Sequence, residues 1–407
     1  MAKSFGAELR ELRKQRGMTQ AAVAQELAVD RASIAQWETD RHLPSPDNVR
    51  RIDAVLEATG ALVSLADELR GGPGPRPTTS RRRLASVLTD VADALVDRVA
   101  TLNGTPLGWG HLLTERHPTP LSTAYVMRTL QLLDDARVDQ HALAKALVKR
   151  EGRGGWSNFL SGDARPEVSA VVLAALARTG QLDDLDAKLG RLREGIDDFA
   201  RSRPYILATV LDCLLSMQST GPFVDELVTA LLSARTPFRE GLLWAADAGV
   251  PARLTQPSLA HTARAVAALH RLRDASGAVD EAVESAVDWI VDSEEPDNGI
   301  TERLQPEIEP GFRQLVAIDH FTAAWCLRAL VAADNVPEAR LRRALDELWS
   351  CYDADLHLWV WKNGGAVPSW MTHDAVTALH ALAIASLPTP VPQYPETDHD
   401  PDSSADA

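Results

Sequence analysis

Cysteine and long apolar runs are scarce in this sequence, and both shortages limit the class of protein. Its 407 residues include three cysteines, Cys213, Cys326 and Cys351, which are scattered and odd in number. This pattern argues against a disulfide framework and favours a reducing compartment. The sequence has no early apolar run of signal-peptide type and no stretch of ~18 apolar residues that could cross a bilayer. We therefore expect a cytoplasmic protein without a membrane partner.

Basic charge is also in short supply, because the chain carries a net charge of −15. Residues 1–70 are almost balanced, with ten Lys/Arg against eleven Asp/Glu, and residues 71–83 hold four arginines and no acid. The remainder is strongly acidic, and such a surface repels nucleic acid. Nucleic-acid binding is therefore expected only near the N-terminus, in residues 1–70 with a contribution from the arginines that follow.

The chain is longer than one ordinary domain, and its composition marks two boundaries. The run GGPGPRP at residues 71–77 cannot form the interior of a helix or strand. Residues 388–407 are rich in proline and then in acidic residues, which predicts a disordered tail. We expect a domain at residues 1–70, a Gly/Pro/Arg linker at 71–83, a second domain at 84–387 and the tail at 388–407.

The first domain contains a stretch, Gly17 to Ser45, whose apolar residues fit two short helices better than one long helix. Thr19 is placed to cap the first helix and Asp30 the second, because their side-chain oxygens can accept a free backbone N–H of the first turn. Small Ala24 lets the two helices cross closely, as a helix-turn-helix requires. Asp40 falls where the chain must turn left-handed, a conformation that Asp tolerates well.

This stretch resembles the Cro/repressor-like (XRE) helix-turn-helix family over roughly residues 5–65. The residues that carry the resemblance are Leu9, Leu12, Arg13, Gly17, Met18, Thr19, Gln20, Ala24, Leu27, Ala28, Val29, Ser33, Ile34, Trp37, Glu38, Arg41, Pro44 and Ser45. Asp40 departs from it, because the family usually has Gly there. The resemblance implies a five-helix DNA-binding domain. The alternative is a helical dimerisation or protein-docking module built on the same bundle.

In this family the second helix of the motif enters the major groove, with its N-terminal residues against base edges. The resemblance therefore implies base readout by Arg31, Ala32, Ser33 and Gln36. Gln20 would support these residues or bind a phosphate, and the expected phosphate contacts are Arg41, His42 and Arg13. Ile34 and Trp37 are assigned to the core. The expected partner is a double-stranded DNA operator, read by a homodimer that is nucleoid-associated when bound.

Residues 84–387 show helical periodicity, no convincing strand pattern and an internal repeat. In each copy, a turn rich in Gly, Pro or Trp precedes a hydroxylated or small residue. The copies begin at Thr123, Ser169, Thr209, Thr262, Ala323 and Thr372. A more polar helix precedes each, at residues 84–102, 140–150, 182–202, 223–234, 278–293 and 337–353. Six such hairpins predict a closed double ring with the Ala/Leu-rich helices inside; an open superhelical stack is the alternative.

The turns make this region similar to the terpenoid cyclase/prenyltransferase (α/α)6 toroid. The similarity is carried by Leu107-Gly108-Trp109-Gly110, Gly154-Gly155-Trp156-Ser157, Trp359-Val360-Trp361-Lys362 and, more weakly, Asp297-Asn298-Gly299-Ile300. Together the two resemblances imply an all-α protein, with an N-terminal five-helix Cro/repressor-like domain and a C-terminal (α/α)6 toroid of six helical hairpins.

The motifs that enzymes of this fold use are missing. The sequence has no DxDD cluster for alkene protonation and no DDxxD cluster for magnesium. The run DDLD at residues 183–186 comes near, but it opens an outer helix, where it suits the helix dipole. Asp212 and Cys213 are adjacent, whereas prenyltransferase zinc sites need an Asp-x-Cys order. We therefore predict no enzyme activity, no catalytic residue, no metal and no cofactor.

Trp, His and Arg side chains gather in or just after the turns that enter the inner helices. The residues are Trp109, His111, Trp156, Trp244, His261, Arg313, His320, Trp361, Trp370 and His373. In a closed toroid these ends converge on one mouth, and several Trp with a few polar groups are typical of a small-molecule site. The alternative is that the Trp are packing wedges between hairpins and the His are satisfied residues at helix starts.

These features favour a sequence-specific DNA-binding transcriptional regulator. Its toroid would sense a small hydrophobic effector, such as an isoprenoid-like molecule, or associate with a protein partner. One alternative is a terpenoid-cyclase-type enzyme to which a helix-turn-helix is fused for self-regulation. Another is a defence or toxin–antitoxin regulator that docks a protein partner.

Overall fold

The computed structural model describes most of the chain, and the fold below is that of the described residues. These are residues 4–27, 29, 31–40, 44, 46–56, 58, 60–69, 81–158, 163–239, 241–249, 256–273, 276–294, 298, 301–304, 307–309, 312–313, 316–333, 336–361 and 365–385. Contacts divide the chain into two compact units, residues 1–78 and 79–407. Each unit is described by itself.

The N-terminal unit is a small helical bundle. Its described helices are α1 (Phe5–Gln15), α2 (Gln20–Leu27), α3 (Arg31–Trp37), α4 (Pro46–Val55) and α5 (Ala61–Leu69). Phe5, Leu9, Leu27 and Ile34 are fully buried in its core. Helices α2 and α3 form the helix-turn-helix, and the five-helix prediction is confirmed. The Ala22 N–H donates to the Thr19 hydroxyl oxygen at 3.1 Å, so the predicted cap of α2 is present; Asp30 lies outside the described residues.

Asp40 has a positive φ of 56°, as the turn after α3 was predicted to need. Its carboxylate also holds the start of α1, because it accepts hydrogen bonds from the Gly6 N–H and the Ser4 hydroxyl, both at 2.6 Å. Gly6 packs so closely that an added Cβ would lie 2.5 Å from the Trp37 carbonyl oxygen. Aspartate therefore supplies an anchor here that glycine could not.

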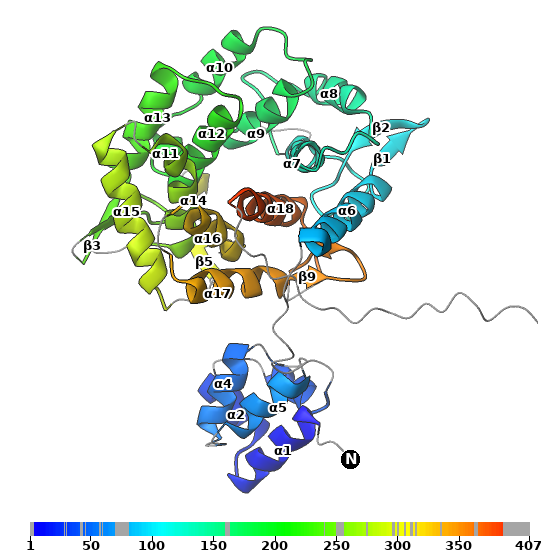
Figure 1. Ribbon diagram of the computed structural model, residues 1–407, viewed down its shortest axis with the longest axis vertical. Helices are drawn as coiled ribbons and strands as arrows, with labels where there is room; N and C mark the ends of the chain where they lie inside the picture. Colours follow the sequence, from blue (N-terminus) through cyan, green and yellow to red (C-terminus); the bar gives the residue numbers. More distant parts are fainter. Residues whose placement is uncertain are drawn as a thin grey trace, which may run out of the picture. The chain divides into compact units, whose positions relative to one another are not determined.

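The second unit is a closed double ring of helices (Figure 1). Its inner helices are α7 (Pro120–Leu132), α9 (Pro166–Ala177), α12 (Pro204–Ser216), α14 (Leu259–Leu269), α16 (Thr322–Val331) and α18 (Ser369–Ile384). Each inner helix packs against the next, and α18 packs against α7. This closure rules out an open superhelical stack, and the predicted toroid is confirmed.

Outer helices precede the inner ones along the chain. They are α6 (Arg81–Asp97), α8 (Gln140–Val148), α10 (Leu185–Glu194) with the short α11 (Asp198–Arg201), α13 (Pro222–Ser233), α15 (Gly277–Asp292) and α17 (Glu338–Trp349), and the 3-10 turn η2 (His270–Leu272) follows α14. Inner helix α9 is buried on almost every side, whereas α17 buries one face and exposes the other. This is the difference expected between helices inside and at the surface of a core.

Short β-hairpins, for which the sequence showed no pattern, join four of the described outer helices (α6, α13, α15 and α17) to the inner helices that follow them, within a unit that is otherwise helical as predicted. The antiparallel pairs are β1 (Ala100–Leu102) with β2 (Thr105–Gly108), β3 (Thr236–Phe238) with β4 (Gly241–Leu243), β5 (Thr301–Leu304) with β8 (Val316–Asp319), β6 (Glu307–Glu309) with β7 (Phe312–Arg313), and β9 (Tyr352–Asp353) with β10 (Leu358–Trp359). Strands of two to four residues are too short to show a period-two pattern.

The described part of the second unit begins within the predicted linker. Helix α6 begins at Arg81, so the last three residues of the predicted linker belong to its first turn. Residues 70–80 and 386–407 lie outside the described residues, and the linker and the disordered tail stay predictions. Among the described helices, none combines the length and apolar character that a membrane span needs.

Candidate nucleic-acid interface and central polar network

Helix α3 presents a polar surface on one side and core residues on the other. Arg31, Ala32 and Gln36 are exposed and Ser33 is half-buried, whereas Ile34 and Trp37 are buried as predicted. The four residues expected to read bases are therefore brought together on one short helix. Arg41 and His42, the expected phosphate contacts, lie outside the described residues.

Glu38, at the end of the motif, joins three elements of the N-terminal unit. The Glu38 side chain is 3% exposed, and its carboxylate accepts hydrogen bonds from Arg13 Nη2 at 3.1 Å and Gln20 Nε2 at 2.9 Å. Arg13 also donates to the Met18 carbonyl at 2.7 Å. Burial opposes ionisation, but hydrogen bonds from Arg13 and Gln20 outweigh it and lower the Glu38 pKa. These contacts give Arg13 and Gln20 a supporting role, and their phosphate contacts stay predictions.

Three of the tryptophans predicted to line a pocket lie in the wall between the two rings of helices. Trp109, Trp156 and Trp244 are fully buried. Their indole N–H groups donate, each at 2.8 Å, to carbonyls near the C-terminal ends of outer helices α6, α8 and α13. Each of these carbonyls also accepts the backbone N–H of the residue three positions further on, so the indole N–H adds a second hydrogen bond at the helix end. The geometry is that of the alternative interpretation, in which these residues are packing wedges.

The repeated hydroxyl residue of the inner helix holds the same tryptophan from the other side. The Trp156 backbone N–H donates to the Ser169 hydroxyl at 3.0 Å, and Trp109 and Trp244 make the same bond to threonines. The residue before Trp156 is Gly155, whose φ is +133° and whose added Cβ would lie 2.4 Å from the Ser169 hydroxyl. The Trp–Ser/Thr contact, which follows a glycine at Trp109 and Trp156 but Leu243 at Trp244, therefore ties outer helices α6, α8 and α13 to inner helices α7, α9 and α14.

The other predicted pocket residues fall into small groups. The rings of His261 and His320 are 5.1 Å apart, and those of Trp361 and Trp370 are 5.3 Å apart. His373 Nδ1 lies 3.1 Å from the Thr129 hydroxyl, deep between α18 and α7. His111 is exposed beside the start of α18, and the Arg313 side chain lies outside what the structure describes. The structure thus brings together pairs rather than one ring of ten residues.

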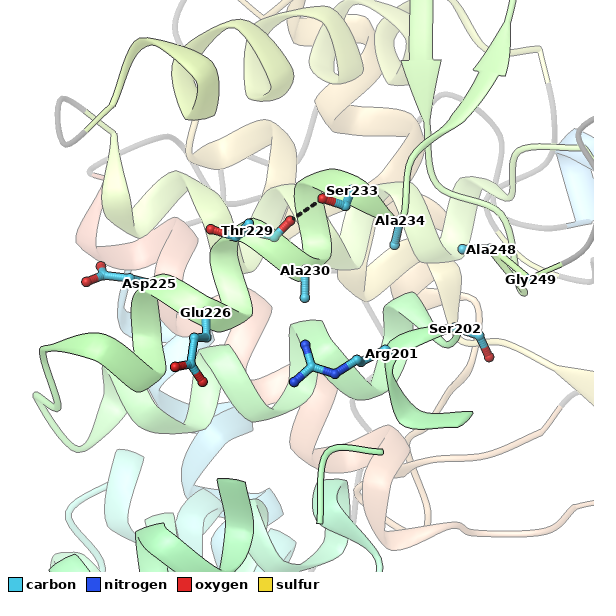
Figure 2. A pocket seen from close by; sticks show the side chains of 10 residues that line it. All are labelled: Arg201, Ser202, Asp225, Glu226, Thr229, Ala230, Ser233, Ala234, Ala248 and Gly249. Carbon is cyan, nitrogen blue, oxygen red and sulfur yellow. Dashed lines mark hydrogen bonds between the residues drawn. The ribbon is translucent and has the colours of Figure 1, made fainter. Parts of the chain in front are cut away.

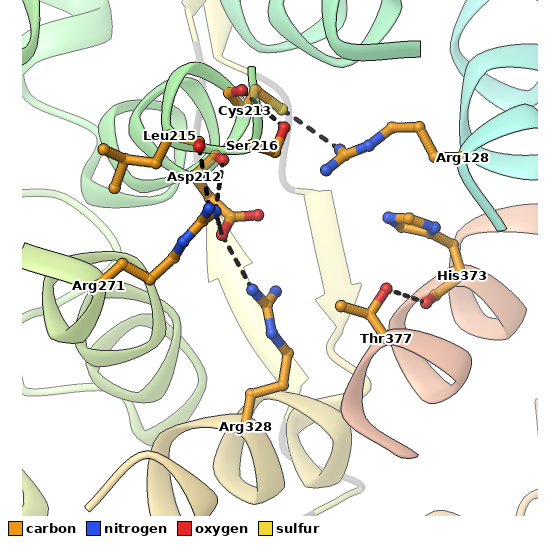
Figure 3. A network of polar contacts seen from close by, with 9 residues as sticks. All are labelled: Arg128, Asp212, Cys213, Leu215, Ser216, Arg271, Arg328, His373 and Thr377. Atoms are coloured by element: carbon orange, nitrogen blue, oxygen red, sulfur yellow. Dashed lines mark hydrogen bonds and ion pairs between the residues drawn. The ribbon is translucent and has the colours of Figure 1, made fainter. Parts of the chain in front are cut away.

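A group of charged side chains, which the sequence did not single out, meets at the centre of the toroid (Figure 3). Asp212 of α12 accepts a hydrogen bond from Arg328 of α16 at 2.9 Å. Arg271 Nη1 lies 3.5 Å from the same carboxylate oxygen and donates to the Asp212 backbone carbonyl at 3.2 Å. Arg128 of α7 points toward the same place and donates to the Cys213 sulfur at 3.4 Å.

Trp325 of α16 extends this group toward α14 and α18. The guanidinium of Arg264 lies 4.2 Å from the centroid of its indole, and that of Arg328 lies 4.9 Å away. The indole also contacts the buried Asp374 carboxyl. We call the whole set the central polar network; its members are Arg128, Asp212, Cys213, Arg264, Arg271, Trp325, Arg328 and Asp374.

The two carboxylates of the network differ in their protonation. Burial opposes ionisation of Asp212, but Arg328, Arg128 and Arg271 outweigh it and lower its pKa to about 2. Burial dominates at Asp374 and raises its pKa to about 6, against the effects of Arg264 and Arg328. Burial and nearby arginines also hold the pKa of His373 well below its usual value, so its imidazole is neutral. The network can therefore hold fixed positive charge beside one ionised and one readily protonated carboxyl.

A sequence signal for this network existed, although no motif contains it. Each contributing inner helix carries a charged residue inside an otherwise apolar or small stretch, as in VLDCLL, CLRAL and TARAVAA. Charged residues are rarely buried unless they are paired. Their large separations along the chain hide the pairing until the ring closes.

The structure also has an open groove of about 630 Å³ on the outer ring (Figure 2). It lies between α11 and α13 and is bordered by Arg201, Glu226 and Ala248. It contains none of the predicted site residues and lies on the outer ring, away from the network. Among the described residues, no group of three His, Cys, Asp or Glu side chains is placed to hold a metal ion.

The N-terminal unit matches a known sequence family. Residues 4–66 match the family described as a helix-turn-helix domain. A comparison with curated protein sequences found no significant match for the chain.

Solved structures that are similar over most of the chain include a mannanase variant, a terpene cyclase and a copalyl diphosphate synthase. An inactive α-1,6-mannanase variant from a Salegentibacter species, bound to α-1,6-mannotetrose, has 12% identity and a TM-score of 0.49 over 74% of this chain and 99% of its own. A type II terpene cyclase from Scytonema has 16% identity and a TM-score of 0.47, over 74% of this chain and 99% of the cyclase chain. The ent-copalyl diphosphate synthase from Streptomyces platensis has 15% identity and a TM-score of 0.42. The match covers 95% of this chain and 88% of the synthase chain.

Proposed function

We propose that this protein is a DNA-binding transcriptional regulator whose toroid responds to a small molecule. The observation that carries the DNA-binding role is the surface of α3. Arg31, Ala32 and Gln36 are exposed there, whereas Ile34 and Trp37 on the same helix are buried. A short helix with this division can enter the major groove while its inner face stays in the core. The match to a helix-turn-helix family over residues 4–66 supports the same conclusion.

The chemistry of the exposed residues suits base readout. Arg31 can donate two parallel hydrogen bonds to guanine, and Gln36 can pair with adenine. The Glu38 contacts to Arg13 and Gln20 hold α1, α2 and the end of α3 in a fixed arrangement. Because a lone motif offers few base contacts, we propose a homodimer that reads two half-sites about 34–36 Å apart.

The experiment that tests this proposal is a genome-wide pull-down of bound DNA with the full-length protein, followed by footprinting on the enriched sequences. We expect an inverted repeat, protected by a dimer. Enrichment of no sequence over random DNA would overturn the proposed function, and a single half-site bound by a monomer would overturn the homodimer.

The second half of the proposal rests on the central polar network. Charged side chains from α7, α12, α14, α16 and α18 face one another inside the ring, where stability alone does not require them. Replacing buried ion pairs with apolar residues is often neutral or stabilising, so such a network indicates a use beyond folding. Effector binding there could change operator affinity only if the ligand binds the DNA-free and DNA-bound states differently.

One observation favours an enzyme as the second candidate. Asp374 is 6% exposed and burial raises its pKa to about 6, so it can hold a proton near neutral pH and act as an acid. Incubating the protein with polyprenyl diphosphates separates the two functions. Turnover that Asp374→Asn abolishes would establish the enzyme, whereas no turnover together with specific DNA binding would establish the regulator.

A further inference from the structure

The central polar network carries more positive than negative charge. Four guanidinium groups, Arg128, Arg264, Arg271 and Arg328, share the network with two carboxylates, Asp212 and Asp374. Even with both carboxyls ionised, two positive charges are left without a counter-charge from the network. The excess stands out in a chain whose net charge is −15. Arg128 and Arg264 are partly buried, so an anion bound nearby would stabilise their charge where water reaches it incompletely.

The excess is localised on two of the four arginines. Arg328 and Arg271 both contact Asp212. Arg128 instead donates to the sulfur of Cys213, whose pKa burial raises, so that its thiol is neutral. The Nε of Arg264 is buried and has no hydrogen-bond partner among the described residues. Neither Arg128 nor Arg264 forms an ion pair with a carboxylate of those residues.

The position of Arg264 suits it for binding. The Cζ of its guanidinium lies 4.2 Å from the centroid of the Trp325 indole, a cation–π contact that places its N–H donors beside the ring. Trp325 is itself buried, so the contact fixes the direction of those donors. A planar guanidinium fixed in this way matches the geometry of carboxylate and phosphate oxygens.

Arg128 and Arg264 act on the same space, although they come from opposite sides of the ring. Burial raises the pKa of the Tyr125 hydroxyl and lowers that of the His373 imidazole, and the positive charges of Arg128 and Arg264 both act on these two groups, opposing burial at Tyr125 and adding to it at His373. Arg128 reaches inward from α7 toward Asp212 and Cys213, as Figure 3 shows. An anion between these groups would therefore be within the field of both arginines.

We propose that the central polar network binds a small organic oxyanion, a phosphate or a carboxylate, through Arg128 and Arg264. This inference deepens the proposed function, because it names the chemical class of the effector. The anion supplies the missing negative charge, Arg264 presents donors held in place by Trp325, and the pair between Asp212 and Arg328 keeps the neighbouring charges satisfied. A neutral hydrophobic molecule of the same size would leave the positive charge unbalanced and bind less tightly.

The test measures binding of simple probes to the full-length protein by calorimetry and by melting temperature. Phenyl phosphate and benzoate carry the two anionic groups on the same ring, phenol is the neutral counterpart, and inorganic phosphate lacks the ring. Ionic strength is held constant with chloride. We expect phenyl phosphate or benzoate to bind saturably and to raise the melting temperature, and phenol to do neither; comparison of the two anions tells which oxyanion is preferred.

Arg264→Met and Arg128→Met should each weaken this binding by about tenfold or more, since a hydrogen bond to a charged group contributes about 1.5–3 kcal/mol. The matched control is Arg153→Met, which removes an exposed arginine of the same unit and should leave binding unchanged. If Arg264→Met does not fold, Arg264→Lys keeps the charge without the planar group, and we expect it to bind more weakly than the original protein.

The oxyanion site would be overturned by equal binding of phenyl phosphate and phenol, or by no loss of binding in the Arg264 and Arg128 variants. Absence of saturable binding for every anionic probe would also overturn it. Measuring operator affinity with and without the bound probe distinguishes the oxyanion site from its proposed effector role. A probe that binds through Arg264 but leaves DNA affinity unchanged would preserve the site and overturn the effector role. Loss of DNA binding altogether would overturn the proposed function alone.

Discussion

Arg328 and Asp212 form an ion pair across the centre of the toroid, with Nη2 2.9 Å from Oδ1 and side-chain exposures of 12% and 14%. The two residues are 116 positions apart in the sequence and come from α16 and α12. The importance of such an enclosed pair for stability shows mainly when one of its two partners is removed. Removing one partner leaves the other charge buried without compensation.

Asp212→Asn should therefore destabilise the toroid by about 3–5 kcal/mol at neutral pH. Arg328 and Arg271 would both lose their carboxylate, and the amide cannot supply a counter-charge. Urea unfolding followed by tryptophan fluorescence measures the change, because the tryptophans of the toroid are largely buried.

The control is Asp93→Asn, which breaks an exposed pair with Arg137 on the outer ring. Exposed pairs contribute at most about 1 kcal/mol, so the urea midpoint of this variant should hardly move.

The stabilisation by Asp212 depends on pH with a definite sign, because the folded pKa of Asp212 is lowered to about 2. Its stabilisation is present above the usual Asp pKa and is lost as pH falls from about 4 to 2. Equal effects of the two substitutions would contradict the role given to the central pair.

The course of the helices could be read from the sequence to a large extent, because their cause is local. The inner helix predicted to begin near Ser169 is α9 (Pro166–Ala177), and the outer helix predicted at residues 140–150 is α8 (Gln140–Val148). Apolar periodicity, capping residues and proline at helix starts act within one or two turns. The hairpins between helices were missed because strands of so few residues leave no pattern.

The site was harder to predict, because its geometry depends on closure of the ring. Trp156 and His320 looked alike as residues near a mouth, yet Trp156 is held by the Leu147 carbonyl and the Ser169 hydroxyl. His320 faces His261 of a neighbouring inner helix. The central polar network joins residues from five inner helices, and only the closed ring brings them within contact distance. Single charged residues in apolar stretches were the one signal available beforehand.

Arg31→Ala and Gln36→Ala should each reduce discrimination between specific and random DNA by about 1–3 kcal/mol. Both side chains are exposed on α3, so the melting temperature should stay nearly constant. Competition binding with the operator and with a scrambled duplex measures the ratio. Gln15→Ala, at the exposed end of α1, is the control and should preserve discrimination. An equal loss of affinity for both duplexes would show contacts to the backbone rather than to bases.

Gly155→Ala should destabilise the toroid by about 1–3 kcal/mol or more, because the turn has a φ that L-residues rarely adopt and no room for a methyl group. The new Cβ would lie 2.4 Å from the Ser169 hydroxyl that accepts the Trp156 N–H. Thermal unfolding measures the loss. Gly190→Ala is the matched control, since Gly190 is exposed within α10 and an added Cβ meets nothing within 4 Å.

That control should stabilise the protein by about 0.5–1 kcal/mol, because alanine restricts the unfolded chain more than glycine does. Opposite signs for the two substitutions are thus expected. If Gly155→Ala were neutral, the joint between α8 and α9 would be looser than the contacts of Trp156 indicate.

Asp374→Asn should make stability less dependent on pH between about 4 and 6. Burial raises the folded pKa of Asp374 to about 6, above the value of about 3.9 expected for the unfolded chain. Within this window the folded protein binds more protons than the unfolded chain, so stability falls as pH rises. A difference of about two pKa units corresponds to about 3 kcal/mol, and asparagine cannot lose a proton. Relative to the original protein, the variant should therefore gain stability from pH 4 to pH 7, as read from urea midpoints at each pH. Parallel profiles for the two proteins would mean that folding does not raise the pKa of Asp374, and the acid role of the second candidate function would then have no basis.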